Sequence, residues 1–241
     1  MDNSIYVALS RQMTLFRDLE VTANNIANVD TNGFNAEKLV FDDFLSPAGN
    51  QRKIAFARDP MSVRDTRNGR VEHTSNSLDM AINGPGYFQI ETPLGTRYTK
   101  AGNFQVNNEG ILVTIDGHPV AGADGGNITI PPDIRDVSIN GAGQISEGEN
   151  QIGQVAVVEF ANEQAMDRVG DTQFKTDQAP LPAERSRVMQ GYLEKSNVNG
   201  VNEMVRLLQL QRSVGSTAKF VEVMYDLQQK TSNTYTRSAQ A

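Results

Sequence analysis

The chain of 241 residues contains no cysteine and no tryptophan, and it has only two histidines. Without cysteine it has neither disulfides nor thiol chemistry. The two histidines, His73 and His118, fall on separate predicted hairpins, so we interpret both as surface or capping side chains rather than metal ligands. The sequence therefore predicts no metal site, no cofactor and no catalytic centre, and we do not expect an enzyme.

Long hydrophobic segments are also missing. No run approaches the ~20 apolar residues that span a bilayer, and Ser10, Arg11 and Gln12 interrupt any apolar segment near the start, so we expect no cleaved secretory signal. The net charge of -7 argues against a general nucleic-acid binder. Hydrophobic residues make up 38% of the chain, which is low for a compact enzyme of this size. These absences favour a structural or interaction protein.

The strongest pattern in the chain is a helix predicted from Asn197 to Lys230, where no proline interrupts the sequence. Its apolar positions recur at alternating spacings of three and four, which is the heptad pattern of a coiled coil. Asn197 or Asn199 is expected to cap its first free N–H groups. The predicted seam consists of Met204, Leu207, Gln211, Val214, Ala218, Val221 and Tyr225.

A comparable pattern occurs at the opposite end of the chain, within residues 3–28. The same spacing there gives a seam of Ile5, Leu9, Gln12, Phe16, Leu19, Ala23 and Ile26. Because neither helix has another partner of this length, we expect the two to pair as a coiled-coil-like hairpin. The fold class expected is α+β, with an all-β domain inserted between the terminal helices.

The middle of the chain changes to short segments that alternate with turn residues. Turn signals every 8–12 residues predict short, meandering strands. Hairpins are expected around 68–69, 83–86 and 107–110, a short helix over 162–169 and a strand over 188–194. The predicted domains are 1–34 with 197–241 (helical), 35–60 with 183–196 (connector) and 61–182 (β).

The end of the first helix is unusually rich in asparagine, with four within the nine residues 24–32. Asparagine is a poor helix former but binds backbone groups well, and Gly33 suits a left-handed turn before the anchor Phe34. Two interpretations stay open: a polar loop, or a specific contact surface for other subunits. We adopt the second, which adds these residues to the predicted interface: Asn24, Asn25, Asn28, Gly33, Phe34 and Asn197.

Four stretches together resemble the flagellar rod and hook proteins. Residues 24–34 (NNIANVDTNGF) resemble the N-terminal signature of that family, and residues 78–88 (LDMAINGPGYF) its central motif. The next motif is matched by 98–104 with 110–114, and the C-terminal signature by 191–199 with 203–205. Within the family, the chain most resembles proximal-rod members. The similarity lies in residues 1–6 and 116–120 and in the modest length of the chain. Asn32 and Asn35 depart from the usual proline and basic residue.

This resemblance implies a function without catalysis. Such proteins are exported unfolded through the flagellar type III apparatus, without a cleaved signal, and polymerise helically in the periplasm. The rod they form transmits torque from motor to hook, and the partners are other rod subunits and copies of the same chain. The alternatives are a distal rod or hook protein of the same family, or a periplasmic peptidoglycan-binding module. We also expect the terminal segments to fluctuate before assembly.

Overall fold

The structure is a computed structural model that describes residues 2–40, 43–46, 54–57, 61–131 and 137–238. The chain divides into two compact units. The helical unit comprises 1–26, 37–63 and 199–241, and the β unit comprises 27–36 and 64–198. Of the expected connector, 37–60 falls in the helical unit and 183–196 in the β unit. The domain boundaries expected from the sequence stay a prediction.

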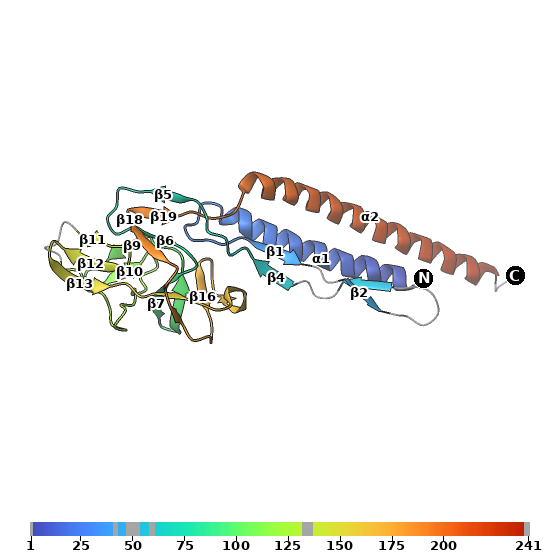
Figure 1. Ribbon diagram of the computed structural model, residues 1–241. Coiled ribbons are helices and arrows are strands. Elements are labelled where there is room, and N and C mark those ends of the chain that lie inside the picture. The colour runs from blue at the N-terminus through green and yellow to red at the C-terminus, as the bar shows by residue number, and fades with distance from the viewer. Residues whose placement is uncertain (1, 41–42, 47–53, 58–60, 132–136, 239–241) are drawn as a thin grey trace. The chain divides into compact units, whose positions relative to one another are not determined.

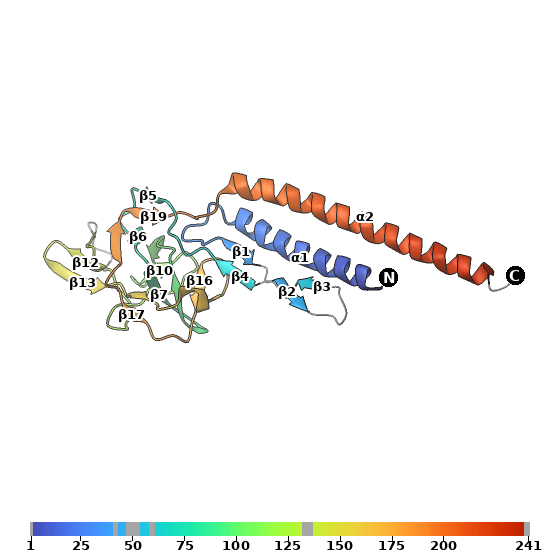
Figure 2. The same cartoon turned by 45° about the vertical axis from the view of Figure 1, so that its right-hand side comes forward.

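Two long helices dominate the helical unit, α1 (Asp2–Ala27) and α2 (Gly200–Ser238). Both views draw α2 alongside α1 (Figures 1 and 2). Asn199 caps α2, because its Oδ1 accepts a hydrogen bond from the Asn202 N–H at 3.1 Å. Within the ranges given above, neither helix is long and apolar enough to cross a membrane.

Short strands follow α1 where the sequence suggested an irregular connector. They are β1 (Glu37–Val40), β2 (Asp43–Ser46), β3 (Ile54–Ala57) and β4 (Met61–Arg64). Strand β2 pairs antiparallel with β3, and β1 pairs with β4. The hairpin expected at 68–69 is therefore wrong, because β4 takes β1 as its partner and β5 (Val71–His73) takes a distant strand, β19 (Tyr192–Glu194). Turn residues alone do not decide which strands pair.

The β unit contains a six-stranded sheet of order β15-β16-β8-β7-β14-β17, with antiparallel neighbours throughout. The order brings together segments far apart in sequence, so the sheet is not a simple meander. Its strands are β7 (Tyr87–Thr92), β8 (Gly95–Thr99), β14 (Val157–Glu159), β15 (Asp167–Arg168), β16 (Gln173–Lys175) and β17 (Leu181–Pro182).

Smaller antiparallel ladders complete the β unit. The hairpin at 107–110 is confirmed, but the one at 83–86 is wrong because β6 pairs with β18. The strand predicted over 188–194 is split at Gly191, which has a φ of 74°. The helix expected at 162–169 is a 3-10 turn, Glu163–Ala165. The remaining strands are β6 (Met80–Asn83), β9 (Phe104–Val106), β10 (Leu112–Thr114), β11 (Ser138–Ile139), β12 (Gln144–Glu147), β13 (Asn150–Gln154) and β18 (Arg187–Gln190).

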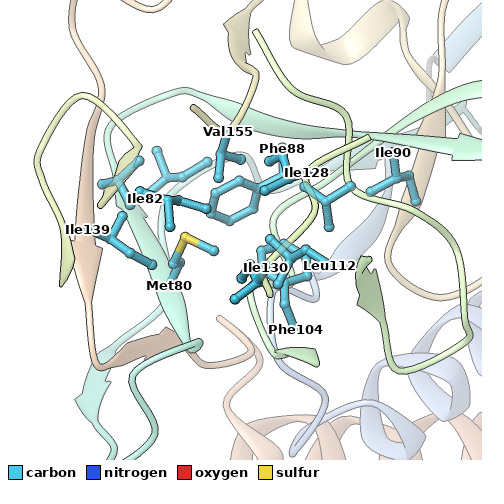
Figure 3. Close-up of a cluster of buried hydrophobic side chains, with 13 residues drawn as sticks. Met80, Ile82, Phe88, Ile90, Phe104, Leu112, Ile128, Ile130, Ile139 and Val155 are labelled. Carbon is cyan, nitrogen blue, oxygen red and sulfur yellow. The ribbon is translucent and has the colours of Figure 1, made fainter. Parts of the chain in front are cut away.

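The apolar core lies in the β unit (Figure 3). Side chains from several ladders meet there, and Phe88 packs edge-to-face on Phe104 with ring centroids 5.1 Å apart. A second, aromatic cluster forms around Tyr87 and Phe174. With two helices and many short antiparallel strands, the molecule is α+β as the sequence predicted. The labelled members of the first cluster are Met80, Ile82, Phe88, Ile90, Phe104, Leu112, Ile128, Ile130, Ile139 and Val155.

Candidate subunit interface

The covered face of α2 repeats every seven residues. Glu203, Leu210 and Thr217 are buried at that interval, and half-buried residues lie between them, Leu207 and Val214 among them. This covered stripe runs one residue earlier than the predicted seam and is partly polar, which a search for apolar spacing does not detect. Of the predicted seam, Leu207, Val214 and Val221 are half-buried, whereas Met204, Gln211, Ala218 and Tyr225 are exposed.

Helix α1 shows the same displacement. Ala8, Asp18, Thr22 and Asn25 are buried, so three of the four buried positions are polar. Because one residue corresponds to about 100° of rotation around a helix, a one-residue change moves the covered stripe well around the helix. Of the predicted seam, Leu9, Phe16 and Ala23 are exposed, Gln12, Leu19 and Ile26 are half-buried, and the side chain of Ile5 lies outside the described part.

One ion pair joins the two helices inside the helical unit. The Arg206 Nη2 donates a hydrogen bond to the Asp18 Oδ1 at 2.7 Å. The Asp18 side chain is 11% exposed and that of Arg206 is 31% exposed, so the pair is partly shielded from water. Nearby, the hydroxyl of Thr22 and one carboxylate oxygen of Glu203 are buried without a hydrogen-bond partner among the described residues. The covered faces of the two helices therefore include polar groups as well as apolar ones.

The same helices also carry large apolar side chains that are exposed. Met13 is 67% exposed and Leu208 is 56% exposed, values at which a large apolar side chain gains little from burial in the single chain. Exposed apolar side chains are the feature that a contact with another protein would use. The large ones are Val7, Leu9, Met13 and Phe16 on α1, and Val201, Met204, Val205, Leu208, Phe220, Val223, Tyr225 and Leu227 on α2.

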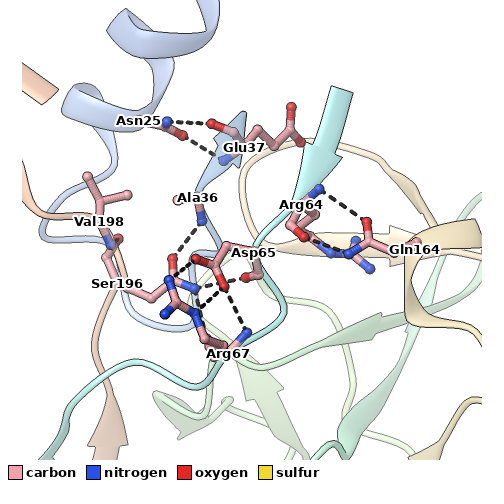
Figure 4. A network of polar contacts seen from close by, with 10 residues as sticks. Asn25, Ala36, Glu37, Arg64, Asp65, Arg67, Gln164, Ser196 and Val198 are labelled. Carbon is pink, nitrogen blue, oxygen red and sulfur yellow. Dashed lines mark hydrogen bonds and ion pairs between the residues drawn. The ribbon is translucent and has the colours of Figure 1, made fainter. Parts of the chain in front are cut away.

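Part of the asparagine-rich signature is used inside the chain. The Asn25 Nδ2 donates to the Glu37 carbonyl at 2.8 Å, and the Asn25 Oδ1 accepts from the Glu37 N–H at 3.0 Å (Figure 4). The buried Asn28 accepts a hydrogen bond from the Thr31 hydroxyl at 3.0 Å, which closes the turn after α1. Asn24 is exposed. The signature thus shapes the exit from α1, and its role against neighbouring subunits stays a prediction.

Gly33 and Phe34 anchor the chain in the β unit. Gly33 has a φ of 70°, and a Cβ at this position would lie 2.4 Å from the backbone nitrogen of Ala101, so no other residue fits without movement. Phe34 is 1% exposed, and the Arg168 guanidinium lies 4.4 Å from the centre of its ring. The left-handed turn and the anchor predicted from the sequence are both confirmed.

Asn197 does not cap α2. Its Oδ1 accepts from the Ala36 N–H at 2.7 Å, and its Nδ2 donates to the carbonyls of Asp65 and Arg67, each at 2.8 Å. The backbone N–H of Asn197 donates to the Phe34 carbonyl at 3.2 Å. This side chain therefore joins the segments at Ala36 and 65–67 to its own segment of the β unit.

A group of buried charges lies close to these segments. Lys100 is fully buried and donates to the Asn68 Oδ1 at 2.6 Å, and Glu194 accepts from the Gly69 N–H at 2.9 Å. Burial lowers the pKa of Lys100, against the opposing effect of Glu194, and burial raises the pKa of Glu194 against the effect of Lys100. Sequence reasoning missed both residues, although each falls within a motif that carries the family resemblance.

The two histidines are separate in the structure. His73, on β5, is exposed and packs edge-on against Tyr192 with ring centroids 5.0 Å apart. His118 is half-buried in the turn after β10. Across the described ranges, no group of three or more histidine, aspartate or glutamate side chains gathers where it could hold a metal ion. The notable features of this molecule are its helix faces and its anchored signatures.

Exposed apolar side chains on two long helices are typical of a protein that assembles with other subunits. Comparisons with known families agree with this class. Residues 5–35 match the flagella basal body rod protein family, 81–147 the flagellar hook protein FlgE/F/G D1 domain, and 189–234 the flagellar basal body rod FlgEFG protein C-terminal family. The chain belongs to the flagellar basal-body rod protein family, and it is a structural rod subunit.

Within that family the chain is FlgF-like. It is 39% identical to the flagellar basal-body rod protein FlgF of Caulobacter vibrioides, over 92% of this chain and 93% of the relative. It is 37% identical to FlgF of Mesorhizobium japonicum over 90% and 91%, and 32% identical to FlgG of Bacillus subtilis over 97% and 99%. These similarities favour the rod function over the peptidoglycan-binding alternative.

Proposed function

We propose that this rod subunit polymerises helically through its terminal helices, in the proximal part of the rod, and transmits torque from motor to hook. The observation that supports this is the apolar outward face of α1 and α2, on which Met13 and Leu208 are more than half exposed. Burying one large apolar side chain contributes roughly 1.5–3 kcal/mol. A neighbouring subunit that covers several of them therefore gains a substantial free energy.

In the same proposal, α1 and α2 pair within each chain as a coiled-coil-like hairpin. The Asp18–Arg206 ion pair and the seven-residue repeat of buried positions on α2 support this pairing. A polar intrachain seam leaves the apolar faces free for other subunits. The partners are other rod subunits and copies of this chain.

The route to the rod is also proposed. The subunit passes unfolded through the flagellar type III export apparatus, without a cleaved signal, and assembles in the periplasm. Terminal helices with polar intrachain contacts are marginal alone, because helices of this kind gain most of their stability from tertiary packing. We therefore expect 1–26 and 199–241 to fluctuate in the dilute chain, whereas the β unit stays folded.

Hydrogen exchange on the dilute full chain tests this expectation. Amides of β7 and β8 should be strongly protected, and those of α1 and α2 should exchange rapidly until assembly. A fragment lacking the helices should span 27–198, because Phe34 and Asn197 bond within the β unit. A shorter fragment, 36–196, would lose both residues. Strong protection throughout α1 and α2 at low concentration would contradict the expectation.

The assembly proposal is tested with Leu208→Asp, which places a charge on the apolar face of α2. We expect the variant chain to be absent from purified basal bodies and its cells not to swim, while thermal unfolding of the β unit is unchanged. Gln209→Asp is the matched control, since it adds the same charge at the adjacent, polar and exposed position. Recovery of both variants in basal bodies at the level of the unaltered chain would reject the proposed interface.

A further inference from the structure

The chain passes between its two units four times, at 26–27, 36–37, 63–64 and 198–199. Any force carried along the backbone from one unit to the other runs through these four connections. An asparagine side chain lies close in sequence to two of them. Asn25 directly precedes the first connection, at 26–27, and Asn197 directly precedes the last, at 198–199.

On the helical side, Asn25 holds the backbone of Glu37. Its side-chain amide makes both a donor and an acceptor bond to the same residue, at 2.8 and 3.0 Å. Glu37 is the first residue of the helical unit after the second connection. This helical clasp (Asn25 with Glu37) therefore ties the first connection to the second, and the Asn25 side chain is 1% exposed, so water does not compete freely for it.

On the β side, the Asn197 side chain holds two stretches of backbone, one at Ala36 and one at 65–67. It accepts from the Ala36 N–H, the last residue before the second connection, and it donates to the carbonyls of Asp65 and Arg67, just after the third. The backbone N–H of Asp65 also donates to the Ala36 carbonyl at 2.8 Å. This β clasp (Asn197 with Ala36, Asp65 and Arg67) ties the second, third and fourth connections together.

The chemistry of the β clasp requires an amide. Asn197 donates with both N–H groups of its side chain and accepts with its oxygen, so both polar atoms of the amide are engaged. An aspartate has the same shape but lacks both donors, and its carboxylate would face two carbonyl oxygens. All three partners are backbone groups, so the clasp fixes the path of the chain whatever side chains lie beside it.

We propose that Asn25 and Asn197 are positioning residues that hold the four connecting segments together, so that load passes through all of them jointly rather than through one at a time. The inference rests on the proposed function, because a torque-bearing subunit is one in which force crosses these connections. The family signatures at 24–34 and 191–199 each contribute one clasp residue. Their asparagines serve the chain's own junction as well as any contact with neighbours.

The first test is hydrogen exchange on the full chain with Asn197→Ala. The Ala36 amide should exchange about tenfold faster, as expected for loss of its hydrogen bond. Asn199→Ala is the control, because it removes the α2 cap only two residues away and should leave Ala36 unchanged. Asn197→Asp should keep Ala36 protected while the carbonyl NMR shifts of Asp65 and Arg67 change. Unchanged Ala36 exchange in Asn197→Ala would overturn the clasp.

The second test separates the clasp from assembly. Basal bodies from cells with Asn197→Ala should contain the chain at the usual level, while swimming speed in viscous medium falls by half or more. Asn25→Ala should act in the same direction. If the Ala36 amide exchanges faster in Asn197→Ala but the cells swim normally, the load-sharing inference is wrong. The assembly proposal is not affected by that result. If the unaltered chain is absent from basal bodies, the assembly proposal is rejected. The effect of Asn197→Ala on exchange of the Ala36 amide would still stand, because it is measured on the isolated chain.

Discussion

The two units use their apolar and polar residues in opposite ways. In the β unit, Phe88 and Leu112 are completely buried, and the core is built from apolar side chains of many strands. In the helical unit, Met13 is 67% and Leu208 is 56% exposed, whereas polar residues such as Asp18 are buried. The β unit has thus covered most of its large apolar side chains within one chain, whereas the helical unit leaves many of them exposed.

This difference fits the proposed assembly of the chain with other rod subunits. Hydrophobic burial is the main favourable term both in folding and in most protein association. The β unit gains the free energy of hydrophobic burial when the single chain folds, so its stability should not depend on neighbouring subunits. Under the proposed function, the helical unit gains it mainly when other subunits cover its exposed apolar side chains. The following predictions test that contrast, from the largest expected effect to the smallest.

The largest effect should come from removing a core aromatic side chain. Phe88→Ala leaves a cavity in the β unit, and we expect a loss of about 3–5 kcal/mol in the free energy of unfolding, measured by urea denaturation. The matched variant is Phe220→Ala on α2, where the side chain is 51% exposed. It should change monomer stability by no more than about 0.5 kcal/mol but reduce incorporation into rods. If Phe88→Ala and Phe220→Ala lower the free energy of unfolding equally, the proposed difference between the β unit and the helical unit is wrong.

A smaller effect is expected at the anchor after α1. Gly33→Val combines an unfavourable positive φ with a close approach to the backbone of Ala101, and the strain should cost about 1–3 kcal/mol. The β unit should remain folded, and motility should fall. Gly117→Ala is the control, because Gly117 also has a positive φ but nothing lies within 4 Å of its added Cβ. If the two variants lose the same free energy of unfolding, the close approach of Gly33 to Ala101 does not contribute to the stability.

Acid should weaken the β unit through Glu159. Burial acts to raise the pKa of Glu159, but hydrogen bonds from Ser186 and Arg185 outweigh it and lower that pKa. In the unfolded chain the carboxyl keeps its higher ordinary pKa. Its stabilisation is therefore present above that value and is lost as the pH falls through the folded-state pKa. Glu159→Gln should flatten the acid side of the curve of unfolding free energy against pH, and an unchanged curve would contradict this assignment.

The sequence alone predicted the parts of the fold that depend on local chemistry. The two helices, the hairpin at 107–110 and the turn at Gly33 followed from apolar spacing and turn residues. Strand pairing was predicted less well, because β5 with β19 and β6 with β18 join segments more than 100 residues apart. Local turn signals contain no information about such distant partners.

For the candidate site, the sequence pointed to the two terminal helices but not to the contacts that each residue makes within the chain. Asn197 was expected as a helix cap, yet it binds backbone groups 130 and more residues away. The covered stripe of α2 includes Glu203 and Thr217, which a search for apolar spacing passes over. The buried Lys100 and Glu194 were missed because charged residues are rarely fully buried and nothing in their spacing marks them as a pair. Each of these depends on tertiary contacts.

The smallest predicted effect concerns the polar seam itself, through the Asp18–Arg206 ion pair. A double-mutant cycle with Asp18→Asn and Arg206→Gln should give a coupling of about 0.5–1 kcal/mol, the range of partly exposed ion pairs. The quantity measured is the opening free energy of the α1 amides at residues 19–25, at concentrations where α1 is protected from exchange. The coupling should shrink in high salt, because this pair is only partly shielded. Met13→Gln, on the outward face, should show no coupling to Arg206→Gln. A coupling of zero between Asp18 and Arg206 would mean that the intrachain seam contributes nothing to holding α1 beside α2, and that neighbouring subunits alone order both helices.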